Sequence, residues 1–131
     1  MFDLNTRILV VDDMLTMRKL VSKVCRDIGF KNLVEAADGA VAWEMISAAV
    51  IPIQLVISDW NMPVSSGLDL LKRVRTDNRF KELPFVMLTA ESEQNQVIEA
   101  VLAGVSNYIV KPFSAQILKE KLDLVYKRAA S

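Results

Sequence analysis

The sequence contains no histidine and only one cysteine, Cys25. Without histidine the chain cannot form a Ser-His-Asp or Cys-His catalytic arrangement, and the usual zinc sites are excluded too. A single cysteine cannot close a disulfide within the chain. Any metal must therefore be held by oxygen ligands, and any acid–base or nucleophilic chemistry must use carboxylates, hydroxyls or lysines.

The chain also lacks an excess of charge of either sign and lacks long apolar runs. Lysine and arginine total 16, and aspartate and glutamate total 16. A general nucleic-acid binder would carry a basic excess. No apolar run approaches the roughly 18 residues of a membrane span, and the opening residues MFDLNTR contain no signal-peptide core. We therefore expect a cytoplasmic protein that binds neither nucleic acid nor membrane.

The 131 residues, 52% of them hydrophobic, fit one compact domain. Short apolar runs alternate with longer segments of helical period. The runs predict strands at 7–11, 32–36, 54–58, 85–88 and 107–110, and the periodic segments predict helices at about 16–28, 38–48, 66–75, 93–103 and 114–128. Apolar strands joined by helical crossovers indicate a parallel sheet covered on both faces, a doubly wound three-layer α/β domain.

Polar side chains follow four of the five predicted strands. Asp12 and Asp13 follow the first, Asp59 ends the third, Thr89 the fourth and Lys111 the fifth. Each taken alone is an ordinary loop residue, since loops are mostly polar. The carboxyl ends of parallel strands meet at one edge of the sheet, where such folds place their ligand sites. Together these residues therefore predict a functional site at that edge.

Three converging carboxylates raise one another's pKa and oppose folding unless cations intervene. Lys111 supplies one positive charge, and a hard divalent ion suits the remainder. A site with few protein ligands and open water positions favours Mg²⁺, which proteins commonly use to handle phosphate. A carboxylate can itself accept a phosphoryl group, and the transfer needs mainly positioning and charge neutralisation. The sequence thus predicts a Mg²⁺-dependent phosphoryl-accepting site.

Four segments together resemble the receiver domains of bacterial two-component response regulators: VVDD at 10–13, SDWNMP at 58–63, LTAE at 88–91 and YIVKPF at 108–113. The similarity covers essentially the whole chain and is greatest for the stand-alone chemotaxis receivers. It implies one receiver domain over residues 1–131, with five helices around a flavodoxin-like sheet. The strand order 2-1-3-4-5 is taken from the family, not worked out from the residues.

The resemblance also implies the roles of individual residues. Asp59 is implied as the phosphoacceptor. Asp12, Asp13, Asp59 and the backbone carbonyl of Asn61 are implied as the Mg²⁺ site. Lys111 is expected to contact the phosphoryl group and, before that group arrives, Asp59.

The remaining implied roles concern the switch and its timing. Thr89 is expected to donate to a phosphoryl oxygen and, with Tyr108, to act as the switch pair. Asn61 and Glu91 match positions that tune how fast the phosphoryl group is lost. The peptide bond after Lys111 is implied to be cis.

Partners follow partly from the missing histidine, because this chain cannot itself be the phosphohistidine donor. A sensor histidine kinase of the chemotaxis (CheA) type is the expected donor, and a phosphatase is a further expected partner. A downstream protein is expected to bind the surface of the fourth helix, fifth strand and fifth helix, which carries Val97, Val101, Tyr108, Ile117, Lys121 and Leu124. The flagellar motor switch is the candidate target, although Glu93 replaces a lysine of the motor-binding face. We expect a monomer, with a dimer through this apolar face as the alternative.

Other functions remain open from the sequence. The chain could be the receiver of a longer regulator with a DNA-binding or enzymatic output. A Mg²⁺-dependent phosphatase with an aspartyl intermediate is a second alternative, but Asp59 is followed by Trp60-Asn61 and not by the Asp-x-Asp-x-Thr pattern. A nucleotide- or flavin-binding module would need a Gly-rich loop after the first strand, where this chain has Asp12-Asp13. Catalysis on an external substrate is therefore not expected.

Four other residues invite structural predictions. Trp60, beside the acceptor, is expected to be exposed and to report the chemistry without performing it. Trp43 and Cys25 have the spacing of core residues. Leu15 stands where serine is usual at the start of the first helix, so we expect a weak N-cap there.

Overall fold

The computed structural model describes residues 1–62, 64–90 and 94–130. Its strands are β1 (Arg7–Val11), β2 (Asn32–Ala36), β3 (Leu55–Asp59), β4 (Phe85–Ala90) and β5 (Asn107–Lys111). Its helices are α1 (Leu15–Ile28), α2 (Gly39–Ser47), α3 (Gly67–Thr76), α4 (Gln94–Leu102) and α5 (Ala115–Ala130). The predicted elements are confirmed, and no end differs from its prediction by more than two residues.

All strand pairs are parallel, and the strand order is β2-β1-β3-β4-β5. This confirms the order 2-1-3-4-5 expected from the family resemblance. β1 and β3 lie side by side at the centre, with Val11 opposite Ser58. The chain crosses from one side of the sheet to the other between these two strands, which is where ligand sites of such folds form.

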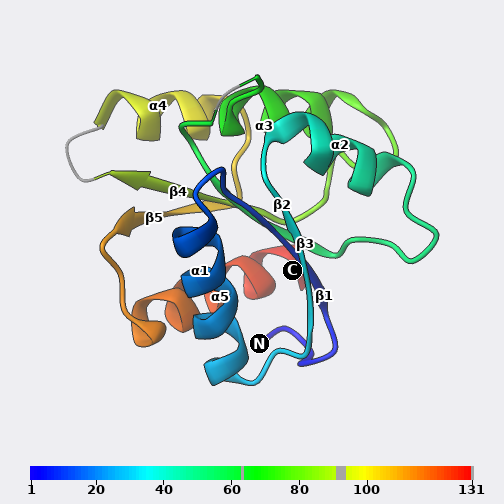
Figure 1. Ribbon diagram of the computed structural model, residues 1–131. Coiled ribbons are helices and arrows are strands. Elements are labelled where there is room, and N and C mark those ends of the chain that lie inside the picture. The colour runs from blue at the N-terminus through cyan, green and yellow to red at the C-terminus, as the bar shows by residue number, and fades with distance from the viewer. Residues whose placement is uncertain (63, 91–93, 131) are drawn as a thin grey trace.

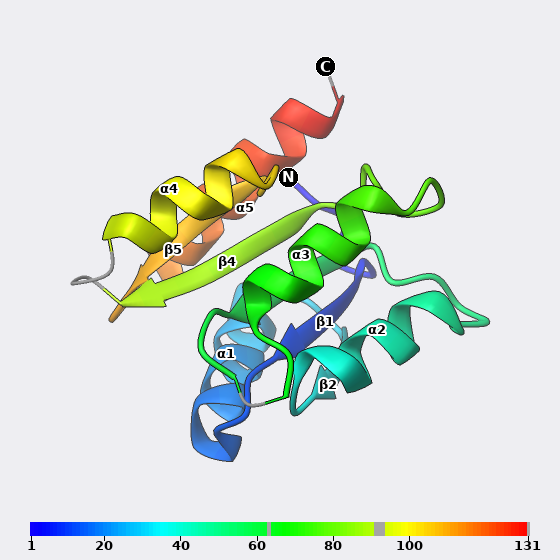
Figure 2. The ribbon, with the colours of Figure 1, turned by 90° about the horizontal axis from the view of Figure 1, so that it is seen from above.

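The sheet separates two layers of helices, with α1 and α5 on one face and α2, α3 and α4 on the other (Figure 1). Seen from above, α2, α3 and α4 lie next to one another over the strands (Figure 2). One core joins Val21 of α1 and Leu118 of α5 to the sheet, and the other joins Ala42, Leu70 and Ala100 from the three opposite helices. Strand side chains buried on both faces explain the continuous apolar runs in the sequence.

The helix ends follow the local sequence closely. Ser66 and Asp69 form a capping box at the start of α3, with the Asp69 N–H donating to Ser66 Oγ at 3.1 Å. Ser114 Oγ accepts from the Ile117 N–H at 3.2 Å at the start of α5. At α1 the N-cap is Met14, and no side chain bonds to the free N–H groups. The expected weak cap beside Leu15 is therefore what the helix has.

Two predicted core residues are placed as expected. Cys25 is completely buried between α1 and the sheet. Trp43 packs against the core on the α2 side, with its ring edge-on to Phe80 and the Arg73 guanidinium 4.6 Å above it. Within the described ranges, no helix has the length and apolarity that crossing a bilayer requires.

Candidate functional site

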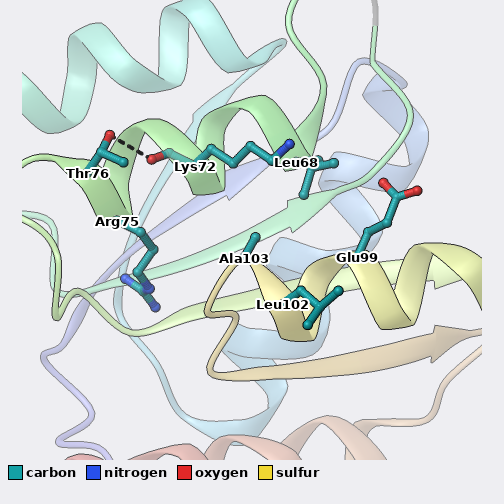
Figure 3. Close-up of a pocket in the computed structure, with 7 residues that line it drawn as sticks. All are labelled: Leu68, Lys72, Arg75, Thr76, Glu99, Leu102 and Ala103. Atoms are coloured by element: carbon teal, nitrogen blue, oxygen red, sulfur yellow. Dashed lines mark hydrogen bonds between the residues drawn. The ribbon is translucent and has the colours of Figure 1, made fainter.

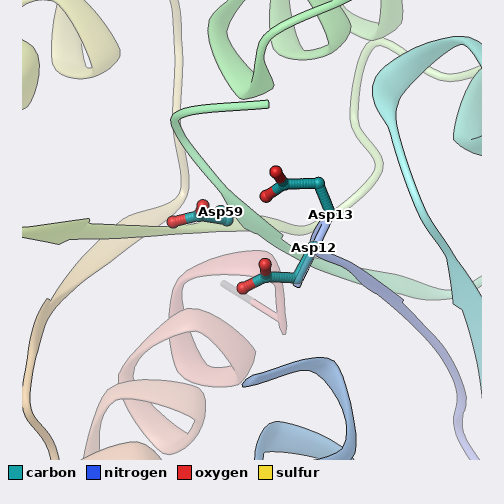
Figure 4. Close-up of side chains that lie close together, drawn as sticks. All are labelled: Asp12, Asp13 and Asp59. Atoms are coloured by element: carbon teal, nitrogen blue, oxygen red, sulfur yellow. The ribbon is translucent and has the colours of Figure 1, made fainter. Parts of the chain in front are cut away.

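Two features of the surface stand apart. A hollow of about 420 Å³ lies between α3 and α4, and both apolar and charged side chains line it (Figure 3). The titratable side chains singled out from the sequence lie elsewhere, at the carboxyl ends of the strands (Figure 4). The chemistry of the molecule therefore belongs to the strand ends, and the hollow is a separate feature.

The ends of β1 and β3 bring three carboxylates together. Asp12, Asp13 and Asp59 each offer an oxygen within 4.8 Å of the others. The parallel pairing of the two strands causes this, because Val11 and Ser58 are register partners and the acids follow directly. Figure 4 shows Asp59, at the end of β3, next to Asp12 and Asp13, which follow β1. Three anions this close are unfavourable without a cation and make an oxygen-ligand metal site chemically suitable.

Asp12 is the most buried member, with 1% of its surface exposed. Its Oδ1 accepts a hydrogen bond from the Met14 N–H at 2.9 Å, whereas its buried Oδ2 has no hydrogen-bond partner. Burial raises the pKa of Asp12, and repulsion from Asp59 and Asp13 adds to this, against the lowering effects of the Met14 N–H and Lys111. A buried carboxylate oxygen without a partner is costly, and a divalent cation would satisfy it.

Lys111 reaches across the sheet from β5 to Asp59. Its Nζ lies 2.6 Å from Asp59 Oδ1, and the two side chains are 24% and 12% exposed. Lys111 pairs in register with Ala90 of β4, so its side chain spans the width of β4 to reach the end of β3. The peptide bond after Lys111 is cis, as expected. One ammonium balances only part of the charge of three carboxylates.

Thr89 is the second-last residue of β4, next to the acceptor strand, and is 1% exposed. Its Oγ1 is buried and has no hydrogen-bond partner. An unpaired buried hydroxyl usually marks either strain or a missing ligand. Because Asp59 pairs with Leu88, Thr89 lies one residue beyond the acceptor's own register position.

Tyr108 lies two residues before Val110, the register partner of Thr89. Residues two apart on a strand, and register partners on neighbouring strands, point to the same face of a sheet. Thr89 and Tyr108 therefore share the face covered by α4, and Tyr108 packs into the core on that side. Lys121 Nζ of α5 lies 4.9 Å from the Tyr108 ring centroid. The two switch candidates are thus connected through one face of β4 and β5.

Asn61 is exposed, and its Oδ1 is 3.5 Å from Nε2 of Gln96 on α4. The other amide atom of Gln96, Oε1, is buried without a partner. Gln96 was not singled out from the sequence, because no local pattern links a residue of the fourth helix to the loop after the third strand. Glu91, Glu93 and Pro63 lie outside the described residues.

The predicted exposure of Trp60 is wrong. Trp60 is only 8% exposed and belongs to the core on the α2–α3–α4 side of the sheet. Its carbonyl accepts from the Gly67 N–H at 2.9 Å, which folds the start of α3 back towards the strand end. A Cβ at Gly67 would overlap the carbonyl of Asp59, so this close return requires glycine. Burying the large indole under that loop is favourable, whereas the sequence alone placed it in an open turn.

Arg18 and Glu35, which support the backbone of Asp12, were also not predicted from the sequence. Arg18 of α1 donates from Nη1 to the Asp12 carbonyl at 2.9 Å and from Nε to Glu35 Oε1 at 2.9 Å. Lys19 adds a second cation 3.0 Å from Glu35 Oε2. Burial alone would raise the pKa of Glu35, but the hydrogen bonds and charges of Lys19 and Arg18 outweigh it and lower that pKa. Arg18 and Glu35 therefore hold the backbone that presents Asp12.

The predicted partner face combines exposed and half-buried side chains of α4, β5 and α5. Val101, Ile117 and Leu124 are 58%, 43% and 55% exposed. Val97, Tyr108 and Lys121 are half-buried. Exposed aliphatic side chains on α4 and α5, with the half-buried Tyr108 of β5, make a suitable protein-binding surface.

The fold and this acidic site together define a class, and the comparisons agree with it. The chain belongs to the response regulator receiver domain family, whose model matches residues 8–123. It is 50% identical over 124 residues to the chemotaxis protein CheY-3 of Vibrio cholerae, covering 95% of this chain and 94% of that one. It is 48% identical over 122 residues to the chemotaxis protein CheY of Pseudomonas aeruginosa, covering 93% and 97% of the two chains.

Solved structures agree. The chemotaxis response regulator CheY4 of Vibrio cholerae superposes with a TM-score of 0.80 at 34% identity, covering 92% of this chain and 98% of that one. The predicted receiver fold and its likeness to the chemotaxis members are thereby confirmed. As a receiver domain of the CheY type, the chain is a phosphorylation-activated signalling switch, a signalling protein and not a classical enzyme.

Proposed function

We propose that Asp59 is the phosphoacceptor of this switch and that a separate sensor histidine kinase of the chemotaxis type supplies the phosphoryl group. The observation that carries the proposal is the contact of 2.6 Å between Lys111 Nζ and Asp59 Oδ1, beside the unpartnered Oδ2 of Asp12. A cation already seated on the acceptor is in place to hold a phosphoryl oxygen. In the transfer, the donor's N–P bond breaks as a carboxylate oxygen of Asp59 forms the new O–P bond.

The residues at the strand ends fit Mg²⁺, because they offer oxygen ligands and a buried carboxylate oxygen with no other partner. Asp12, Asp13, Asp59 and the backbone carbonyl of Asn61 would hold the ion. When bound, Mg²⁺ supplies neutralisation of the negative charge on the phosphoryl oxygens. Arg18 keeps the Asp12 backbone in position for this task.

The chain's own side chains then read the new group. The free hydroxyl of Thr89 donates to a phosphoryl oxygen and moves towards Asp59, because it has no competing partner. Tyr108, on the same face of the sheet, follows into the space that Thr89 leaves, and this changes the surface of α4, β5 and α5. Asn61 and Glu91 would set how fast the phosphoryl group is lost. The α4–β5–α5 surface would thus change when Asp59 is phosphorylated, although Asp59 lies on another part of the molecule.

The output is a downstream protein that binds the α4–β5–α5 face only after phosphorylation. The relatives in Vibrio cholerae and Pseudomonas aeruginosa carry the name of chemotaxis proteins, and this supports a chemotaxis pathway in the cytoplasm. A flagellar motor switch is the candidate target, and the exposed Val101, Ile117 and Leu124 would supply its apolar contacts. A phosphatase that removes the group would reset the switch.

The test uses acetyl phosphate with Mg²⁺, and beryllofluoride as a stand-in for the phosphoryl group. In a Trp43→Phe background Trp60 is the only remaining tryptophan. We expect its fluorescence to change on addition of either reagent, because the indole follows Asp59 directly and is buried beside it. The matched variant Asp59→Asn should show no change and no acyl phosphate on a phosphate-affinity gel. If Asp59→Asn responds like the parent protein, Asp59 is not the acceptor.

A further inference from the structure

The hollow between α3 and α4 is not used by the proposed switch. This α3–α4 groove has a volume of about 420 Å³ and an apolar lining of Leu68, Leu102 and Ala103. The α3 wall carries Lys72 and Arg75, and the α4 wall carries Glu99 (Figure 3). Arg75 donates to the carbonyls of Gly104 and Leu83. Among the described residues neither Lys72 nor Glu99 has a side-chain hydrogen bond or an ion-pair partner, although opposite charges on neighbouring helices often pair. The groove therefore presents an exposed cation, an exposed anion and an apolar floor, with no ion pair between the described residues of its two walls.

The outer ridge of α4 beside the groove is apolar as well. Leu102 is 83% exposed and Ile98, one turn earlier, is 59% exposed. Both side chains point away from Ala100, the buried contact of α4 with the core. Neither Ile98 nor Leu102 belongs to either hydrophobic core of the monomer. The ridge is an apolar projection lying next to an apolar depression.

These features complement one another in a two-fold arrangement. A two-fold axis through the groove sets the α3 wall of one copy against the α4 wall of the other. Glu99 of each copy then faces Lys72 of the other, and each Leu102 covers the floor of the opposite groove. The same two-fold rotation therefore forms two Lys72–Glu99 pairs and buries the Leu102 side chain of each copy. A partner of a single charge would leave either Lys72 or Glu99 unpaired or repelled.

We propose that the α3–α4 groove is the docking surface for a second copy of this chain, in an isologous dimer held by Leu102 and by two Lys72–Glu99 pairs. The groove is short, so the contact belongs to the small, transient class of interfaces. It lies on the other side of α4 from Val101, Ile117 and Leu124. The dimer therefore leaves the proposed target-binding face free, and the inference does not depend on which aspartate is phosphorylated.

The experiment measures the mass of the full chain by sedimentation equilibrium up to about 1 mM protein, a range that captures weak contacts. We expect a concentration-dependent monomer–dimer equilibrium. Leu102→Asp should abolish it, and because Leu102 is exposed the variant should keep the circular dichroism spectrum of the parent. Lys72→Glu and Glu99→Lys should each weaken the dimer by about tenfold or more, because each creates like-charge contacts. The double variant with both exchanges should restore the parent affinity.

Leu124→Lys is the matched control, since Leu124 is equally an exposed leucine but lies on α5. It should leave the dimer unchanged. A parent protein that stays monomeric throughout the concentration range overturns the proposal, as does a dimer that survives Leu102→Asp. Failure of the double exchange to restore affinity also overturns it, because only copies facing each other through this groove predict rescue. Dissociation by Leu124→Lys would assign self-association to the α4–β5–α5 face instead.

Discussion

Lys111 and Asp59 are 52 residues apart in the chain, yet the lysine Nζ lies 2.6 Å from the carboxylate Oδ1. Among the described residues this is the one ion pair made by the three clustered acids. Asp12 and Asp13 therefore share the site without a cation of their own. The clustered negative charge lowers the stability of the folded state, but it lies where it can bind a ligand. Functional sites are commonly less stable than they could be for this reason.

Replacing Lys111 by methionine should destabilise the protein in the presence of EDTA. The change leaves a nearly buried Asp59 carboxylate beside two other acids, and we expect the free energy of unfolding to fall by about 1–3 kcal/mol, less than for a fully buried pair because Lys111 is 24% exposed. Saturating Mg²⁺ should recover a larger part of the stability than in the parent. Urea unfolding with EDTA and with Mg²⁺ measures both effects. Lys23→Met, at an exposed pair with Asp27, is the control and should change little.

Magnesium should stabilise the parent protein through Asp12. This carboxylate is buried, its pKa is raised by burial and by its acidic neighbours, and its Oδ2 lacks a partner. Asp12→Asn removes the charge, so we expect about 1 kcal/mol more stability in EDTA and little further gain on adding Mg²⁺. Thermal unfolding under both conditions gives the comparison. Equal Mg²⁺ stabilisation of parent and variant would show that the ion binds without Asp12.

Glu35→Gln should make stability less dependent on acid. The folded pKa of Glu35 is lowered by its bonds to Lys19 and Arg18, which outweigh its burial. A lowered folded pKa gives stability that is complete above the ordinary value of 4.5 and is lost as the pH falls through the folded value. We therefore expect the variant to be about 1–2 kcal/mol less stable at neutral pH, a difference that shrinks below pH 4.5. Denaturant unfolding across this pH range tests the prediction.

The strand ends were predictable because topology decides their location. Once five apolar strands are parallel, every residue that follows a strand lies at the same edge, so Asp12, Asp59 and Lys111 could be grouped from their positions alone. Capping at Ser66 was predictable because its partner Asp69 is three residues away. These features depend on short-range pattern and on connectivity, and both can be read in a single sequence.

Contacts between side chains of different helices were not predictable in this way. The burial of Trp60 depends on how the segment before α3 folds back, and the contact between Gln96 and Asn61 depends on the tilt of α4. The bond from Arg18 to the Asp12 carbonyl depends on a rotamer held by Glu35. Such arrangements depend on distances between elements, which periodicity and spacing do not contain.

Replacing Val64 should make the protein more stable. Its φ is 68°, in the left-handed region that a β-branched residue rarely adopts, and its side chain is 87% exposed. Asparagine tolerates this conformation far better, so Val64→Asn should raise the free energy of unfolding by about 1 kcal/mol. Val50→Asn is the control, because Val50 is 98% exposed and its φ is not positive. Equal effects of the two substitutions in urea unfolding would exclude backbone strain as the cause.

Arg75 should anchor the far end of α4. Its Nε donates to the Gly104 carbonyl and its Nη1 to the Leu83 carbonyl, both at 2.7 Å, while Nη2 lies 3.3 Å from Ser106 Oγ. Burial lowers the pKa of Arg75, and no carboxylate within the described ranges pairs with it, so its bonds to carbonyls replace the lost solvation. Arg75→Met removes these donors at once, and we expect a loss of about 2–4 kcal/mol in the free energy of unfolding.

Hydrogen exchange can show whether Arg75→Met destabilises only the elements that Arg75 contacts or the whole domain. Gly104 closes α4 and Ser106 precedes β5, so Arg75→Met should lower hydrogen-exchange protection most strongly in these two elements and least in α1. Arg73→Met is the matched control, because Arg73 is exposed and only stacks on Trp43, a contact of about 1 kcal/mol or less. Uniform loss of protection across the sheet would contradict the anchoring role. Protection lost selectively in α4 and β5 would show that Arg75 anchors these two elements.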